Sequence, residues 1–201
     1  DWRNADLDMR TLDGLLASLD ARAPSGELVR VRDADDHLAL QQLARDAELR
    51  DLAKGRVALL WEVARIPDFR KQMSDMHARL LATVFRHLAG PSARLPDEWV
   101  AKSIARLDDS EGDIDRLLQK IAAIRTWTYV SHRADWLADA ATHQAKARAV
   151  EDRLSDALHE RLTQRFVDRR NAVIVRKLAD GEDLLASVAA DGEVRVEGVH
   201  A

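Results

Sequence analysis

The sequence predicts an all-α fold: an irregular multi-helix bundle with one long C-terminal helix and a short terminal β-hairpin. Three observations support this prediction. Aromatic residues make up only 4% of the 201 residues, so leucine, alanine, valine and isoleucine must build the core, a composition that favours helices over sheets. Apolar residues recur at intervals of three and four positions through most of the chain. Breaking residues such as Gly55, Pro67 and Gly90 fall where these periodic stretches end.

Five short helices are expected in the first half of the chain. Thr11 is a plausible N-cap for the first helix, and the aspartates at 33, 35 and 36 suit the positive end of the dipole of the second. Pro67 ends the third, because the residue before a proline is pushed out of the α region. The fifth opens at Pro96. The expected ranges are 11–21, 33–53, 57–65, 74–89 and 96–107.

Two longer segments, 113–137 and 141–178, form the centre of the predicted fold. Apolar residues in the first follow helical spacing from Ile114 to Trp127, with a break expected at 132–135. The second holds about 38 residues, which would span roughly 57 Å as one helix. That length exceeds an ordinary globular helix, so we expect it to kink or to cross between modules.

The C-terminal tail differs from the rest of the chain. Residues 184–188 and 194–196 are rich in β-prone side chains, and Asp191-Gly192 between them is a good hairpin-turn signal. We therefore divide the chain into a helical domain, 1–180, and a hairpin, 181–201, which would begin a truncated β-rich tail. Because the sequence begins at Asp1 without a methionine and stops in a predicted strand, we expect a fragment of a longer protein.

Composition excludes several classes of function. The absence of cysteine excludes a disulfide scaffold, a thiolate metal site and a cysteine nucleophile. No apolar run reaches the roughly 18 residues of a membrane span and no signal peptide opens the chain, so we expect a cytoplasmic protein without membrane contact. A net charge of −4 gives no global attraction to nucleic acid, so such binding would need a local patch.

Catalytic motifs are also missing. Neither the P-loop pattern GxxxxGK[ST] nor GxGxxG occurs. His159-Glu160 begins like a zinc-protease helix, but position 163 is threonine, which excludes HExxH. Paired acids on predicted helices, such as Glu151-Asp152, are typical of solvated faces. We therefore predict no catalytic, cofactor-binding or metal-binding residue in this chain.

Arginine at helical spacing is the one feature that indicates binding. A row of guanidinium groups beside aromatic rings can follow a phosphate backbone and stack on bases. Residues four apart share a helix face, which places Arg161, Arg165 and Arg169 together. The candidate nucleic-acid-binding residues are Arg125, Arg133, Arg161, Arg165, Arg169 and Arg170, with Trp127, Tyr129 and Trp136 as aromatic support.

Two other interpretations of these residues stay open. Acids such as Asp156, Glu160 and Asp168 could pair with the arginine row in internal salt bridges, or the row could face a protein partner. The tryptophans, including Trp127 and Trp136, could anchor the core instead of stacking on bases.

Three stretches resemble a known family. They are LLWEVARIPDFRK at 59–71, EGDIDRLLQKIAAIRTWTYVSHRADWL at 111–137, and AVEDRLSDALHERLTQRFVDRR at 149–170. Together they resemble the helicase-like proteins of alphaproteobacteria, which are similar to the mitochondrial RNA-degradosome helicases of the Suv type. These are ATP-dependent superfamily II enzymes, in which two RecA-like motor domains are followed by a helical C-terminal region and, in bacterial members, a small β-rich tail.

The resemblance implies a non-catalytic C-terminal accessory domain. Such a domain would pack on the motor domains of the same parent chain and help to guide single-stranded RNA or DNA. ATP and Mg²⁺ would belong to the parent helicase, an ATP hydrolase, because no position in this chain matches the family's ATP-binding or helicase motifs. The alternative is an independent helical protein–protein interaction module with no nucleic-acid role.

Overall fold

A computed structural model describes residues 1–70, 75–179, 186–188 and 194–196. These residues form eight helices, which confirms the predicted all-α class, and two short strands near the C-terminus. The elements are α1 (Leu12–Leu19), α2 (Asp35–Leu43), α3 (Ala47–Leu52), α4 (Val57–Ala64), α5 (Asp75–Ala89), α6 (Asp97–Ala105), α7 (Ile114–Ser131), α8 (Ala140–Ala179), β1 (Ala186–Val188) and β2 (Val194–Val196).

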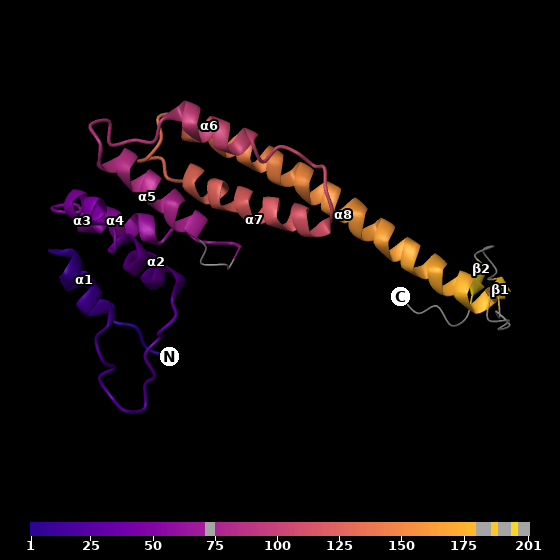
Figure 1. The fold of residues 1–201 in the computed structure, drawn as a ribbon, viewed down its shortest axis with the longest axis horizontal. Coiled ribbons are helices and arrows are strands. Elements are labelled where there is room, and N and C mark those ends of the chain that lie inside the picture. The colour runs from indigo at the N-terminus through magenta and orange to yellow at the C-terminus, as the bar shows by residue number, and fades with distance from the viewer. Residues whose placement is uncertain (71–74, 180–185, 189–193, 197–201) are drawn as a thin grey trace.

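The helices form an elongated bundle with one protruding helix (Figure 1). The short helices α1 to α4 lie at one end, and α5 joins them to the rest. Helices α7 and α8 pack along one another, and α6 packs against both. Helix α8 then continues well past the bundle, and β1 and β2 lie at its far end. No helix among the described residues is long and apolar enough to cross a bilayer.

The core is aliphatic, as the composition predicts. Leucines from α1, α2 and α4 meet Phe85 of α5 in one end of the bundle, and residues of α7 and α8 fill the other end. Burial of such side chains is the main stabilising contribution in a small domain. The largest fully buried residues are Phe85, Leu15, Leu40, Leu49, Leu60, Ile66, Leu81, Ile104, Leu117, Ile124, Leu154 and Val63.

Local capping sets several helix ends. The Thr11 hydroxyl accepts a hydrogen bond from the Gly14 amide at 3.0 Å, which confirms the predicted cap of α1. Asp113 caps α7 in the same way by accepting from the Arg116 amide at 2.8 Å. Gly55, which follows α3, has a φ of 73°, a left-handed conformation that glycine adopts without strain.

The predicted helix at 33–53 is wrong as a single element, because the structure divides it into α2 and α3. Asp46 begins a new helix: its carboxylate accepts hydrogen bonds from the amides of Glu48 and Leu49 at 2.9 and 3.3 Å. Aspartate competes with the helix for backbone donors, so it favours a helix start over a helix interior. Arg86 of α5 then pairs with both Asp46 and Glu48, which holds α3 against α5.

The long C-terminal helix is confirmed. Helix α8 is one α-helix of 40 residues, about 60 Å at 1.5 Å per residue. It leaves the bundle without interruption, so of the two expectations, a kink or a crossing beyond the module, the kink is wrong. Strands β1 and β2 pair antiparallel, with Val188 opposite Val194. The hairpin turn predicted at 190–192 lies outside the described residues, as does the start of the predicted first strand.

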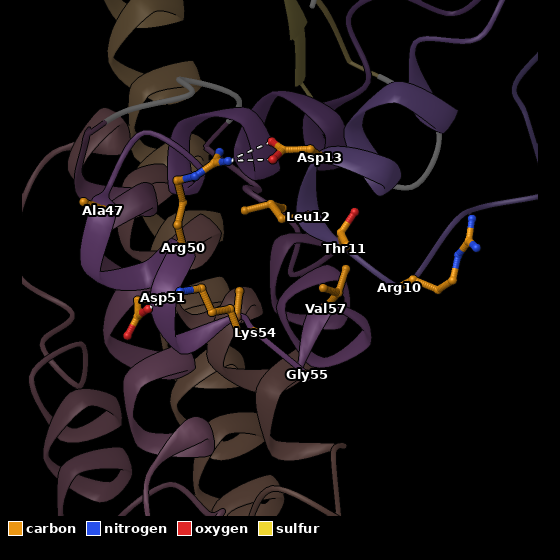
Figure 2. A pocket seen from close by; sticks show the side chains of 11 residues that line it. Arg10, Thr11, Leu12, Asp13, Ala47, Arg50, Asp51, Lys54, Gly55 and Val57 are labelled. Atoms are coloured by element: carbon orange, nitrogen blue, oxygen red, sulfur yellow. Dashed lines mark hydrogen bonds and ion pairs between the residues drawn. The ribbon is translucent and has the colours of Figure 1, made fainter.

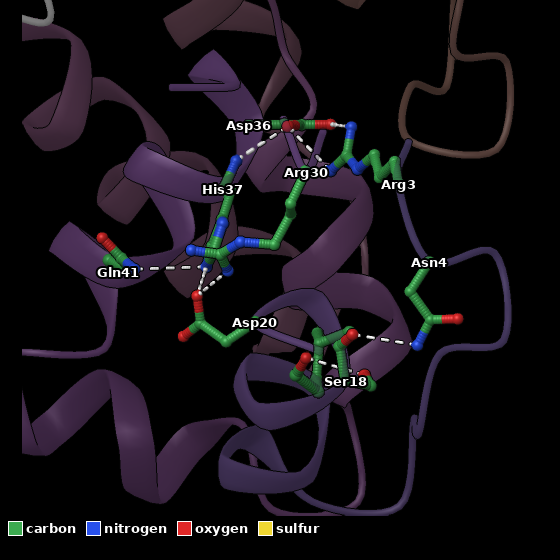
Figure 3. Close-up of polar contacts among 9 residues, drawn as sticks. Arg3, Asn4, Ser18, Asp20, Arg30, Asp36, His37 and Gln41 are labelled. Carbon is green, nitrogen blue, oxygen red and sulfur yellow. Dashed lines mark hydrogen bonds and ion pairs between the residues drawn. The ribbon is translucent and has the colours of Figure 1, made fainter. Parts of the chain in front are cut away.

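Polar contacts hold the N-terminal segment to the bundle (Figure 3). Arg3 makes a two-bond ion pair with Asp36 at the start of α2, with both distances 2.9 Å. Asp20, at the end of α1, forms an ion pair with Arg30 and lies beside the buried ring of His37 on α2. These contacts join segments that are not adjacent in sequence, and they give the start of the chain before α1 a defined path.

Candidate nucleic-acid interface

The predicted arginines fall into two groups that differ in position and partners. Arg125 and Arg133 lie on the bundle, where α7 ends and packs against α8. Arg161, Arg165, Arg169 and Arg170 lie on the C-terminal half of α8, which leaves the bundle. The two groups therefore form separate surfaces, and each is described below with the residues that surround it.

The two bundle arginines are held in internal ion pairs. The Arg125 Nε donates to Glu151 Oε1 at 3.0 Å. Arg133 donates to Glu62 at 2.6 Å and to Asp135 at 3.2 Å, and its guanidinium carbon lies 4.3 Å above the ring centre of Trp136. This arrangement satisfies charge and stacks the planar group on an aromatic face. Arg133 therefore makes internal salt bridges, a type of contact that the sequence analysis considered for the row at Arg161, Arg165 and Arg169.

Two of the three aromatic candidates are core residues. Trp127 and Trp136 are 7% and 2% exposed, and Trp127 meets Trp99 edge to face at a centroid distance of 5.1 Å. Rings buried to this degree offer no face to a base at the surface. Tyr129 is only partly buried and stands at the edge of an open pocket.

The second group forms what we call the basic arm, residues 161–179 of α8. It holds six arginine or lysine residues and one aspartate, although the chain as a whole carries a net charge of −4. Arg165, Arg169 and Arg170 are exposed, and within the described residues none of them has an ion pair. Arg161, at the start of the arm, donates a long 3.4 Å hydrogen bond to the Gly112 carbonyl.

Exposed apolar side chains are interleaved with these charges. Phe166 is 67% exposed, and Val167, Val173 and Val175 are also exposed. From Thr163 to the end of α8, every side chain that the structure describes is exposed. The arm is thus a bare helix that presents cations and apolar groups together, a combination used for both phosphate backbones and stacked bases.

A pocket of about 370 Å³ opens where α7 meets α8, and we call it the α7–α8 pocket. It brings together three of the predicted residues, Arg125, Tyr129 and Arg133, as their spacing of four along the chain suggests. The sequence analysis missed its other members, and treated Glu151 as part of a solvated face. Its full lining is Phe69, Arg125, Thr128, Tyr129, His132, Arg133 and Glu151.

Hydrogen bonds at the pocket define the state of His132. Its Nδ1 lies 2.7 Å from the Thr128 carbonyl, and since a carbonyl only accepts, Nδ1 carries the proton. The unprotonated Nε2 then accepts from Arg148 at 3.3 Å. Beside it, the hydrogen bond from Arg133 lowers the pKa of Asp135. The pocket therefore holds two arginines, Arg125 and Arg133, both partly neutralised by acids, and Arg148 lies against His132.

The other cavities show less relevant chemistry. A pocket of about 500 Å³ lies between α1 and α3 (Figure 2), where Arg50 pairs with Asp13 and Lys54 pairs with Asp51, at 2.8 and 2.7 Å. Its charges are thus already balanced. Another cavity is lined by His77 of α5, whose pKa is lowered by burial. Within the described part of the chain, no three histidine, aspartate or glutamate side chains gather as metal ligands.

Comparisons of this chain with protein-family models, with curated proteins and with solved structures found no match.

Proposed function

We propose that this chain is a non-catalytic helical accessory domain of an ATP-dependent superfamily II helicase, and that it guides single-stranded RNA or DNA along the basic arm. The observation that carries the nucleic-acid part is the arm itself. Arg165, Arg169 and Arg170 are exposed and have no acidic partner among the described residues. Cations without intramolecular partners can neutralise phosphates and release their counterions, which is the main source of affinity for a strand.

The helicase part of the proposal rests on the resemblance of 59–71, 111–137 and 149–170 to the Suv-type family. Support comes from the positions of the second and third stretches, since α7 and α8 pack along each other and form one surface. In this proposal the motor domains of the parent chain bind ATP and Mg²⁺ and move the strand. The bundle supports the motor, and the arm lies along the path of the strand.

A second candidate is a helical module that binds protein through the same arm. The observation that favours it is the exposure of Phe166, Val167 and Val175 on the part of α8 that extends past the bundle. Exposed apolar side chains on a helix can anchor it in the groove of a partner protein. The two candidates differ in which side chains matter: arginines for a strand, and the apolar residues for a protein.

Fluorescence anisotropy with a labelled, unstructured oligonucleotide tests the proposal. We expect Arg165→Glu/Arg169→Glu to weaken binding at low salt, for deoxy or ribo strands. Each lost phosphate contact lowers the slope of log K against log salt by about 0.7 for single strands, so two should lower it by about 1.4 or more. The fold should persist, because the structure pairs neither side chain with an acid.

The matched control is Arg94→Glu/Arg106→Glu, which makes the same change in net charge on exposed residues of the bundle. This control should keep most of the wild-type affinity and the wild-type salt slope. Equal losses in the two double variants would point to net charge alone and would contradict the arm. Unchanged binding in the arm variant would remove the nucleic-acid role and leave the protein-binding candidate.

A further inference from the structure

The α7–α8 pocket combines aromatic surface with a specific pair of polar groups. Phe69, from the connection after α4, and Tyr129, from α7, line it with rings, and Phe69 is 42% exposed. Flat ring surfaces at the mouth of an open pocket are suited to stacking against an unpaired base. The polar groups Glu151 and Arg125 line the same pocket and are available to the edge of such a base.

Glu151 has unused hydrogen-bonding capacity. One carboxylate oxygen accepts from Arg125 Nε at 3.0 Å, and the other accepts from the Thr128 hydroxyl at 3.2 Å. A carboxylate offers about four acceptor positions, so about two remain. The side chain is 24% exposed in the wall of the pocket. It can therefore accept a further hydrogen bond from an entering amino group.

Arg125 supplies the complementary donors. Only its Nε is used by Glu151, and within the described residues neither of its Nη nitrogens has a hydrogen bond. The side chain is 52% exposed, so these nitrogens can reach an entering group. In this pocket Glu151 can therefore accept a hydrogen bond, and Arg125 can donate one. Cytosine and adenine present the reverse order, an amino donor beside a ring-nitrogen acceptor. Uracil would instead set its O4 against the carboxylate.

The pocket and the basic arm are parts of one face of α8. Arg169 follows Glu151 by about five full turns at 3.6 residues per turn, so the two lie in line along the helix. Arg165 lies close to the same line. The distance from Glu151 to Arg165 along the axis is about 21 Å at 1.5 Å per residue. A strand of a few nucleotides can therefore contact the arm and reach the pocket.

We propose that the α7–α8 pocket binds one unpaired cytosine or adenine, the bases whose pairing edge places an amino donor beside a ring-nitrogen acceptor, in a strand held by the basic arm. This inference rests on the proposed function, because the arm supplies the strand. Tyr129 and Phe69 stack on the base, Glu151 accepts from its amino group, and Arg125 donates to the adjacent ring nitrogen. The contact gives a base preference to a surface whose other contacts are to phosphate.

The test compares labelled oligodeoxycytidylate with oligodeoxyuridylate of equal length at neutral pH, since the two differ in the group that Glu151 would meet. We expect the wild type to bind the cytosine strand about tenfold or more tightly, the size of one hydrogen bond to a charged acceptor. Glu151→Gln should bring the ratio close to one, because an amide can also donate to O4. The control is Glu160→Gln on the opposite face of α8, which should keep the ratio.

A second pair of variants tests the stacking without touching the charge. Tyr129→Leu should weaken cytosine binding severalfold, whereas Tyr129→Phe should keep it. Equal affinity for both strands in the wild type, or equal ratios in the two glutamine variants, would overturn the base pocket. If the base pocket is overturned but Arg165→Glu/Arg169→Glu still weakens binding, the proposed role of the arm is retained. If the wild type binds neither strand, both the pocket and the proposed function fail.

Discussion

At the scale of single residues, the arginines illustrate how a neighbour decides what a side chain does. Arg133 and Arg169 have the same charge, and both were candidates for a nucleic-acid contact. Arg133 is enclosed by Glu62, Asp135 and the face of Trp136, whereas Arg169 stands on a bare helix. The first contributes to the stability of the bundle, and the second remains available to a ligand.

We expect Arg133→Ala to lower the free energy of unfolding by about 1–2 kcal/mol. The change removes a cation–π contact and leaves Glu62 without its cation. Arg133→Lys should lower the free energy of unfolding by less, because it keeps the positive charge. It should still lower it, because lysine lacks the planar guanidinium that stacks on Trp136 and donates two parallel hydrogen bonds. Urea unfolding followed by circular dichroism measures both. A loss under ~0.5 kcal/mol for the alanine variant, typical of an exposed pair, would contradict a structural role.

At the scale of elements, α2 and α3 show where periodicity alone is insufficient. Apolar residues continue across the break, with Leu40 and Leu43 before it and Leu49 after it, all buried. The periodic signal therefore does not register the change of helix axis. The signal that could have located the break is Asp46, a strong N-cap residue inside an otherwise regular pattern.

Asp46→Ala should lower the free energy of unfolding by about 1–2 kcal/mol. It removes the acceptor for two amides at the start of α3 and one of the two acids that pair with Arg86. Thermal unfolding of Asp46→Ala and of the control Asp51→Ala measures the two losses of stability. Asp51 lies in the same helix, is exposed and, among the residues that the structure describes, pairs with Lys54 alone, so its removal should change stability far less. Similar effects in the two variants would show that the cap is unimportant.

At the scale of the whole molecule, charge is segregated along the sequence. The basic arm holds an excess of cations, and the acids that make the total negative lie both before it and in the C-terminal segment 180–201 that follows it. The arm also lacks the tertiary packing that stabilises most helices, since its described side chains beyond Leu162 are exposed. Repulsion between the cations and the lack of packing both destabilise the arm in the free protein. A polyanion bound along the arm would reduce that repulsion.

Hydrogen exchange should therefore divide α8 into two parts. We expect amides near Val150 and Leu154, which are buried in the bundle, to exchange far more slowly than amides after Thr163. Addition of a single-stranded oligonucleotide should slow exchange in the arm and leave the bundle unchanged. Mass spectrometry of peptic peptides resolves the two segments. Equal protection in the absence of ligand would mean that the arm is already covered, which would contradict its availability to a strand.

The sequence by itself determined the helical class, most helix ends and the length of α8. These depend on local physics: apolar spacing, capping side chains, and the backbone limits of proline and glycine act within a few residues. It also determined that the arm is basic, since its cations are close in sequence. It did not locate the break at Asp46, whose competing cap is hidden within a continuous apolar pattern.

Only the tertiary structure decided which arginines are already paired and which are available. The partner of Arg133 lies 71 positions away at Glu62, and that of Arg125 lies 26 positions away at Glu151. No local pattern encodes such distances, because they depend on how separate helices pack. The same packing decided where the bundle ends along α8. That boundary separates the arginines held within the fold from those left exposed to solvent.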